Sequence, residues 1–180
     1  IVSYYWFNIT ILTFFWEIFF IYNYHKINQI SIDFINNNKH VWTNNYSLLY
    51  ILPWNLPNIF YAEYGAYADR EYMSNDLWSR EIEGTHAFIC GIFSLFAIYS
   101  KSNNYNTKFL ICSSISMGSK LMNSILYMGE YFIQINDSNS VNYNSNKFPV
   151  GKFLSERPFI YVNVFWSLCP LYVIIKSLYY

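Results

Sequence analysis

The chain has 180 residues, of which 12% are charged and 23% aromatic, and its 11 basic and 11 acidic side chains give a formal net charge of zero. An average soluble domain carries about 25% charged residues, so a chain with this few charges is not expected to form an ordinary soluble globule. Without an excess of basic residues there is no footprint for a phosphate backbone, and nucleic acid is not an expected partner.

Four stretches of the chain are apolar enough to cross a membrane. A transmembrane helix needs about 20 mostly apolar residues to span roughly 30 Å of hydrocarbon. Stretches of this kind occur at residues 1–22, 83–100, 109–135 and 159–179. They lack the alternation of polar and apolar residues that membrane barrel strands show. The sequence therefore predicts an all-α, multi-pass transmembrane helical bundle with four visible spans.

The segments between these stretches are predicted to be two polar loops and one interfacial segment. Residues 23–45 and 136–147 are rich in Asn, and we expect them to be solvent loops inserted into a single membrane domain. Residues 47–61 are apolar but are interrupted by Pro53 and Pro57. Their Trp and Tyr residues favour a segment that lies at the membrane interface and does not span it.

Polar side chains inside the spans are the candidate functional residues, because an ionisable group near the centre of a bilayer costs roughly 2.5–3.5 kcal/mol on insertion scales. Glu17, Glu83, His86 and Asn163 are of this kind. Glu83 and His86 are three residues apart and share one helix face, as Asn163 and Trp166 do in the last span. If these faces converge, they line an apolar, aromatic cavity with two carboxyls, an imidazole, an amide and an indole.

Each candidate also has an ordinary structural interpretation. Glu83 lies near the predicted start of its helix, where a carboxylate offsets the helix dipole. His86 can hydrogen-bond a neighbouring carbonyl, and Asn163 and Trp166 can serve in helix packing. Glu17 is the hardest to explain in this way, because a carboxylate deep in an apolar span needs a proton or a partner.

A metal site is the main chemical alternative. Glu83 and His86 have the spacing found on the helices of di-iron proteins, but such a site needs this pair twice and two further carboxylates. The other two histidines, His25 and His40, lie in the first polar loop. We therefore expect no metal and no other cofactor.

An ordered set of short motifs resembles a known membrane family. Glu63 and Tyr64 precede Asp69 and Arg70, and Glu83 follows fourteen residues after Asp69. This order is similar to the signature of the emopamil-binding protein family, also called the EXPERA family. Its members include the sterol Δ8–Δ7 isomerase and the sigma-2 receptor.

The last span extends the resemblance, because Asn163, Trp166 and Pro170 have the family's spacing there. Glu17 then corresponds to the glutamate of the family's second span, which implies a fifth, N-terminal span before Ile1. The resemblance covers about residues 10–177.

The chain departs from the family pattern at three positions, two of which are on the walls of the expected site. The isomerase has a histidine four residues before the glutamate of the second span, where this chain has Thr13. His86 in turn stands where the isomerase has a threonine. Arg70 follows Asp69 directly, whereas the family's arginine lies two residues after the aspartate. A histidine has thus been lost at Thr13 and another has appeared at His86 on the facing wall. This indicates either that His86 compensates for the lost histidine or that the sequence has drifted.

The resemblance implies a sterol Δ8–Δ7 isomerase that moves a ring double bond by protonation and deprotonation. Glu17, Glu83 and His86 would be its catalytic groups. Asn163 and Trp166 would bind the substrate within the bundle.

Tyr64 and Asp69 would close the mouth of the cavity. A hydrophobic amine would bind in the same cavity, because its ammonium resembles the carbocation intermediate. Membrane lipid is the other expected partner.

Two other functions remain open at this point. The same cavity would serve a non-catalytic protein that binds a sterol or an amphiphilic amine, which Thr13 favours because a hydroxyl is a poor proton donor. The chain could also be a structural subunit of a membrane complex or a homodimer. The family implies the endoplasmic reticulum membrane, and a mitochondrial membrane is the alternative.

Overall fold

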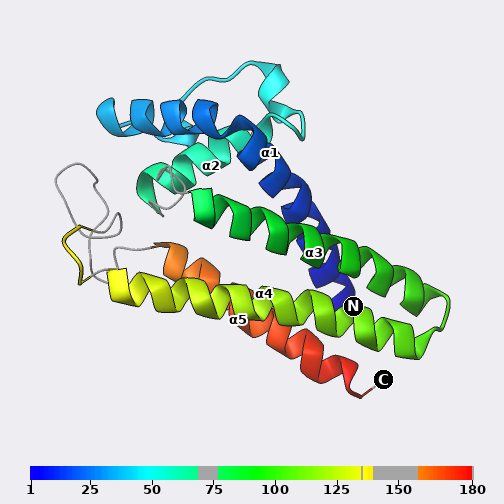
Figure 1. The fold of residues 1–180 in the computed structure, drawn as a ribbon. Coiled ribbons are helices and arrows are strands. Elements are labelled where there is room, and N and C mark those ends of the chain that lie inside the picture. The colour runs from blue at the N-terminus through cyan, green and yellow to red at the C-terminus, as the bar shows by residue number, and fades with distance from the viewer. Residues whose placement is uncertain (69–76, 135, 140–157, 180) are drawn as a thin grey trace. The chain divides into compact units, whose positions relative to one another are not determined.

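Within residues 1–68, 77–134, 136–139 and 158–179, which the computed structural model describes, every regular element is a helix (Figure 1). The elements are α1 (Val2–Asn36), η1 (Val41–Thr43), η2 (Leu48–Ile51), α2 (Leu56–Tyr67), α3 (Leu77–Ser102), α4 (Asn106–Gln134) and α5 (Pro158–Ser177), where η denotes a short 3₁₀ helix. The all-α prediction is confirmed.

Four of these helices are long and apolar enough to cross a membrane: α1, α3 over Arg80–Ser102, α4, and α5 over Ile160–Ser177. Their exposed faces carry large apolar side chains, among them Phe15, Phe96, Leu126 and Phe165. Side chains of this kind suit a surface that contacts lipid. The chain is therefore an integral membrane protein, and each predicted stretch coincides, to within two residues at its ends, with part of one of these helices.

The first polar loop begins later than the sequence predicts, because α1 continues to Asn36. The buried residues of this second half of α1 recur every three or four positions: Tyr24, Ile27, Ser31 and Phe34. Ser31 Oγ donates a hydrogen bond of 2.8 Å to the carbonyl of Ala62 in α2. The prediction of a loop is thus wrong for residues 23–36, where the polar residues between the buried ones lie on the outer face of an amphipathic helix.

An asparagine ends α1. Asn38 has φ 49°, in the left-handed region that Asn tolerates better than most residues. The Lys39 N–H donates to the carbonyl of Phe34 at 2.9 Å, and the Asn38 N–H donates to that of Ile35 at 3.3 Å. These two bonds form a Schellman motif, so the run of three asparagines has a structural role at the end of the helix.

The interfacial segment forms no long helix. It holds the 3₁₀ helix η2 and the first half of α2, where Pro57 occupies the first turn and needs no hydrogen-bond partner for its nitrogen. Apolar side chains on it are exposed: Leu48, Leu49, Ile51, Trp54 and Phe60. This agrees with the prediction of a segment that lies at the interface. The second predicted loop, 136–147, falls outside the described residues except for 136–139, which form no helix.

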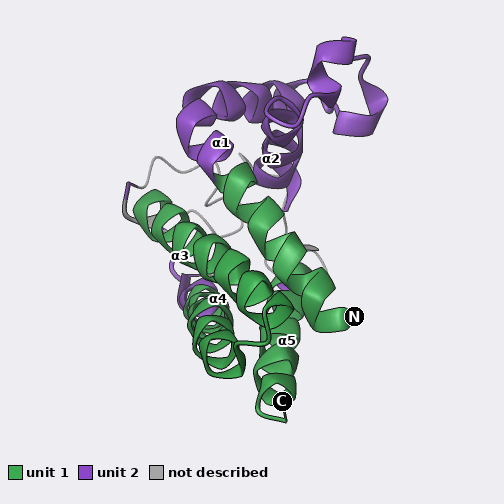
Figure 2. Cartoon of the chain, turned by 90° about the vertical axis from the view of Figure 1, so that its right-hand side faces the viewer, with its two compact units in different colours: residues 1–17, 80–128, 162–180 green, residues 18–79, 129–161 purple. Residues whose placement is uncertain are grey.

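The chain divides into two compact units (Figure 2). Unit 1 comprises Ile1–Glu17, Arg80–Met128 and Val162–Tyr180, and therefore holds the first half of α1 with most of α3, α4 and α5. Unit 2 comprises Ile18–Ser79 and Gly129–Tyr161, which include the second half of α1, α2 and the end of α4.

Small residues hold the helices of unit 1 together. Ser94 of α3 and Ser116 of α4 share a hydrogen bond of 2.8 Å between their hydroxyls, and Ser116 Oγ also lies 2.8 Å from the carbonyl oxygen of Cys90. Between α4 and α5, the hydroxyls of Ser113 and Ser177 are 3.0 Å apart. Short hydroxyl side chains allow close approach and hydrogen-bond across the interface, as is common in membrane bundles.

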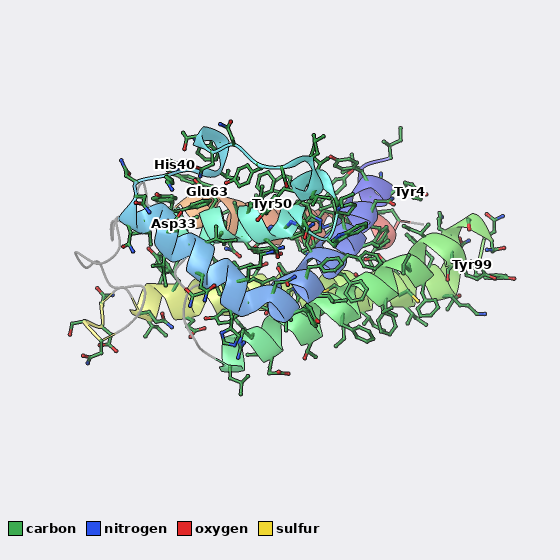
Figure 3. The ribbon with its side chains drawn as sticks, turned by 90° about the horizontal axis from the view of Figure 1, so that it is seen from above. Tyr4, Asp33, His40, Tyr50, Glu63 and Tyr99 are labelled. Carbon is green, nitrogen blue, oxygen red and sulfur yellow. The ribbon has the colours of Figure 1, made fainter. Side chains whose placement is uncertain are left out.

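The His40 clasp, made by His40, Glu63, Trp42 and Tyr67, ties the segment after α1 to α2 in unit 2. Figure 3 shows His40 and Glu63 of this clasp. Glu63 Oε1 lies 2.7 Å from His40 Nδ1, and Glu63 Oε2 accepts the Val41 N–H at 3.0 Å. The imidazole contacts the Trp42 ring at a centroid distance of 5.2 Å and the Tyr67 ring at 4.3 Å. The clasp therefore combines a contact between imidazole and carboxylate with packing of the imidazole against two aromatic rings.

Gly91 provides a test of how closely α1 and α3 pack. A Cβ added at Gly91 would lie 2.5 Å from Phe14 Cβ, an atom next to the backbone of α1. We expect Gly91→Ala to lower the free energy of unfolding by about 1–3 kcal/mol, because the two helices must move apart. The measurement is the melting temperature of the purified protein in nanodiscs. Gly118→Ala is the matched control: its Cβ meets nothing within 4 Å, so it should be neutral or stabilising by up to about 1 kcal/mol. Equal effects of the two substitutions would contradict this packing.

Tyr67 provides a test of the clasp in unit 2. Its hydroxyl lies 2.8 Å from the carbonyl oxygen of Phe34 and 2.7 Å from that of Lys39. Tyr67→Phe should destabilise the protein by about 1 kcal/mol, since the carbonyls of Phe34 and Lys39 lose the hydroxyl donor that they share. Tyr22→Phe, at an exposed tyrosine of the same unit, should have no effect.

Tyr67 also predicts a pH dependence. Burial, and then the negative charge of Glu63, raise the pKa of Tyr67 above its ordinary value. A raised pKa means that the folded state holds the proton more tightly, so this contribution to stability is complete below about pH 10 and is lost as the pH rises further. The difference in melting temperature between wild type and Tyr67→Phe should therefore shrink at alkaline pH. A difference that stays constant or grows above pH 10 would contradict the assignment.

Candidate functional site

Unit 1 brings ionisable and polar side chains from four helices together at membrane depth. We call this set the polar cluster; its members are Glu17 of α1, Glu83 and His86 of α3, Lys120 and Asn123 of α4, and Trp166 of α5. Each helix turns its member inward by the same periodicity that buries its apolar residues. Glu17 follows the buried Phe14 by three positions, and Lys120 follows the buried Met117 by three.

Glu83 is bound from both its own helix and α4. Its Oε2 lies 3.3 Å from His86 Nδ1, and its Oε1 accepts a hydrogen bond of 3.2 Å from Asn123 Nδ2. His86 Nδ1 also lies 3.1 Å from the carbonyl oxygen of Glu83. Both neighbours of Nδ1 are acceptors, so the proton of a neutral ring belongs on Nδ1 and Nε2 is the basic nitrogen.

The structure weakens the ordinary interpretation of Glu83 as a helix-end charge. The sequence predicts that Glu83 stands near the start of its helix, but α3 begins six residues earlier, at Leu77. The effect of the helix dipole falls off within the first turn. Glu83 lies beyond that turn, so its partners are the side chains around it.

Lys120 joins the carboxylates of two helices. It is only 3% exposed, and it interacts electrostatically with both Glu17 and Glu83. Its Nζ lies 3.9 Å from the centroid of the Trp166 ring, within the range of a cation–π contact. One ammonium therefore offsets charge from α1 and α3 while it stacks on α5.

The structure brings four of the predicted site residues together: Glu17, Glu83, His86 and Trp166. Asn163 lies on α5 one turn before Trp166 and is half-buried; its carbonyl accepts a hydrogen bond of 2.9 Å from Ser167 Oγ.

The structure does not test the two residues predicted at the cavity mouth. Tyr64 belongs to α2 in unit 2, and Asp69 lies outside the described residues. Their role at a mouth stays a prediction.

Thr13 does not supply a free hydroxyl in place of the histidine that the family pattern has there. Its Oγ1 donates a hydrogen bond of 2.9 Å to the carbonyl of Ile9, four residues earlier on α1. Thr residues within helices commonly bind their own backbone in this way. The imidazole of the cluster comes from α3, through His86.

Sequence reasoning missed Lys120 and Asn123. The indication was present, because Lys120 is an ionisable residue inside an apolar stretch and meets the criterion applied to Glu17 and Glu83. Asn123 lies three residues after Lys120, on the same helix face. A long lysine side chain is usually expected to extend to the membrane surface, so a lysine that is buried within the bundle is easily overlooked.

The arrangement offers acid–base chemistry in a medium of low dielectric constant. It holds two carboxyls, one ammonium and one imidazole, with an amide and an indole beside them. Charges that are kept from water interact strongly, so a change in one protonation state alters the others. Among the described residues, no group of three or more His, Cys, Asp or Glu side chains could hold a metal ion.

Asn123 tests the link between α4 and Glu83. Asn123→Asp replaces the amide donor, 3.2 Å from Glu83 Oε1, with a second carboxylate. We expect a loss of about 1–3 kcal/mol in stability at neutral pH, because two like charges then face each other in a dry site. The loss should shrink on acidification, since one proton shared by the two carboxyls removes the repulsion. The control is Asn103→Asp, at an exposed amide after α3, and a loss as large in the control would exclude the assigned contact.

Comparison of the chain with protein families, with curated proteins and with solved structures gave no match in any of the three.

Proposed function

We propose that this integral membrane protein is a sterol Δ8–Δ7 isomerase, and that the polar cluster of unit 1 carries its chemistry. The observation that carries the proposal is the convergence on Lys120 of two carboxyls from separate helices, one of them bound to an imidazole. The motif resemblance to the emopamil-binding protein family supplies the substrate class and the endoplasmic reticulum as the compartment.

The proposed reaction needs an acid and a base but no oxidant or reductant. A proton is added to one carbon of the ring double bond, which leaves a carbocation on the other. A proton is then removed from the carbon next to the cation, and the double bond forms in its new place. One proton enters and one leaves, so the substrate keeps its formula.

His86 is the proposed proton donor. Its Nδ1 is held by Glu83, which leaves Nε2 to carry and deliver the second proton of an imidazolium. The carboxylate of Glu83 stabilises that imidazolium, as second partners of catalytic histidines commonly do. Glu17 is the proposed base, because it comes from a different helix and can take the proton from the neighbouring carbon. The π face of Trp166 would stabilise the carbocation once the Lys120 ammonium has moved from it.

The second candidate is a non-catalytic protein that binds a sterol or an amphiphilic amine. One observation favours it: the hydroxyl of Thr13 is engaged with its own helix. Such a protein would need the same cluster for recognition but no proton donor.

A turnover assay separates the two candidates. The full chain in nanodiscs is incubated with a Δ8 sterol, and the position of the double bond is followed by mass spectrometry. We expect conversion by the wild type, and a loss of at least about 100-fold in Glu83→Gln and in His86→Ala, the range typical of a lost acid or base. Glu130→Gln, at an exposed carboxyl of α4, is the matched control and should keep full activity.

A double exchange tests the placement of the imidazole. Thr13→His combined with His86→Thr restores the family arrangement and should retain conversion, whereas His86→Thr alone should abolish it. No conversion by the wild type would reject the isomerase, and unchanged activity of Glu83→Gln would reject the proposed site.

A further inference from the structure

The face of Trp166 is occupied by a cation of the chain itself. Lys120 Nζ lies 3.9 Å from the ring centroid, so there is no room for a second ammonium on that face of the indole. The neighbouring Ser124 on α4 also contacts α5, with its hydroxyl 3.4 Å from the carbonyl oxygen of Trp166. The stem of Lys120 is therefore fixed at the interface of α4 and α5.

The charges that face this ammonium come from two other helices. Glu17 reaches it from α1 and Glu83 from α3, and the thiol of Cys90 on α3 also interacts with it. His86 is paired with Glu83, with its Nδ1 3.3 Å from Glu83 Oε2. The ammonium thus lies against an aromatic face, and the charges of two carboxyls act on it; groups of these two kinds recognise a buried ammonium ligand.

We propose that Lys120 is an internal cation that occupies the cation-binding position of the polar cluster, so that a hydrophobic amine binds there only by displacing the Lys120 ammonium. The inference shares its site with the proposed function but needs no turnover. It makes Lys120 an autoinhibitory group: its tethered ammonium competes with any cationic guest, since two like charges cannot share one dry site.

The test compares variants at Lys120 for amine binding. The full chain in nanodiscs is titrated with tritium-labelled dimethylamino-cholestane, and bound label is counted. Lys120→Met keeps the length of the side chain and removes its charge, and it should raise the affinity by about tenfold or more, the effect of one cation–π contact together with the freed carboxyls. Lys120→Arg keeps the internal cation and should bind no tighter than wild type. Cholestane, which has no charge, should compete equally in all variants.

Two further variants control the comparison. Lys108→Met removes an exposed lysine of the same helix, whose ammonium lies 4.9 Å from the ring of Tyr105, and it should leave amine affinity unchanged. Lys120→Met combined with Glu17→Gln removes one charge of each sign, and so it should fold even if the single variant does not. This double variant should also gain affinity. Folded Lys120→Met, or the folded double variant, with the affinity of wild type would overturn the proposal.

A measurement on the unaltered protein does not depend on any variant folding. With ¹⁵Nζ-labelled lysine, saturating amine should shift the Lys120 resonance and leave that of Lys108 in place. Amine bound without a change at Lys120 would overturn the proposal. A gain in affinity at Lys120→Met without turnover of a Δ8 sterol would support the internal cation and reject the isomerase. Turnover of a Δ8 sterol without a gain in amine affinity at Lys120→Met would support the isomerase and reject the internal cation.

Discussion

The buried ammonium of Lys120 is the constraint on which unit 1 depends. An ion that leaves water for a medium of low dielectric constant costs several kcal/mol even after relaxation, and only well-placed partners offset that cost. Lys120 finds Glu17 on α1, Glu83 on α3 and the ring of Trp166 on α5. Each of these interactions joins α4 to another helix. The periodicity that buries the apolar residues of the helices also turns these charged groups inward, and apolar packing such as that of Phe14 on Gly91 fixes how closely α1 and α3 approach.

Much of the fold follows from hydropathy and periodicity, because spans need long apolar stretches and the stretches are present. What the sequence hides is the second half of α1. Its buried positions from Tyr24 to Phe34 keep a helical period, but Asn, Lys and Asp fill the positions between them, and composition alone resembles a loop. The end of the helix is also concealed: Asn38 adopts a left-handed conformation that closes a Schellman motif, and a run of asparagines does not reveal which one does so.

The contacts of the site within one helix could be predicted from the sequence, whereas those between helices largely could not. Glu83 and His86 are three residues apart, so their contact follows from helix geometry alone. The bond from Asn123 to Glu83 and the stacking of Lys120 on Trp166 depend on which helices are neighbours and in what register, and no local pattern contains that information. The motif resemblance supplied the order of the glutamates and of Trp166. It could not supply Lys120, which belongs to none of those motifs.

Two glutamate–histidine pairs in this chain have different surroundings, and that difference decides what each can do. In unit 2, Glu63 is bound by His40 and by the Val41 N–H, and the stacked rings of Trp42 and Tyr67 hold the imidazole; its charge is met by fixed donors. In unit 1, Glu83 shares the single ammonium of Lys120 with Glu17. With a neutral His86, two carboxyls face one cation, so either a proton or a guest cation must supply the remaining charge. A structural clasp does not lack positive charge in this way. A site that exchanges protons or binds cations does need an excess of negative groups that a proton or a cation can neutralise.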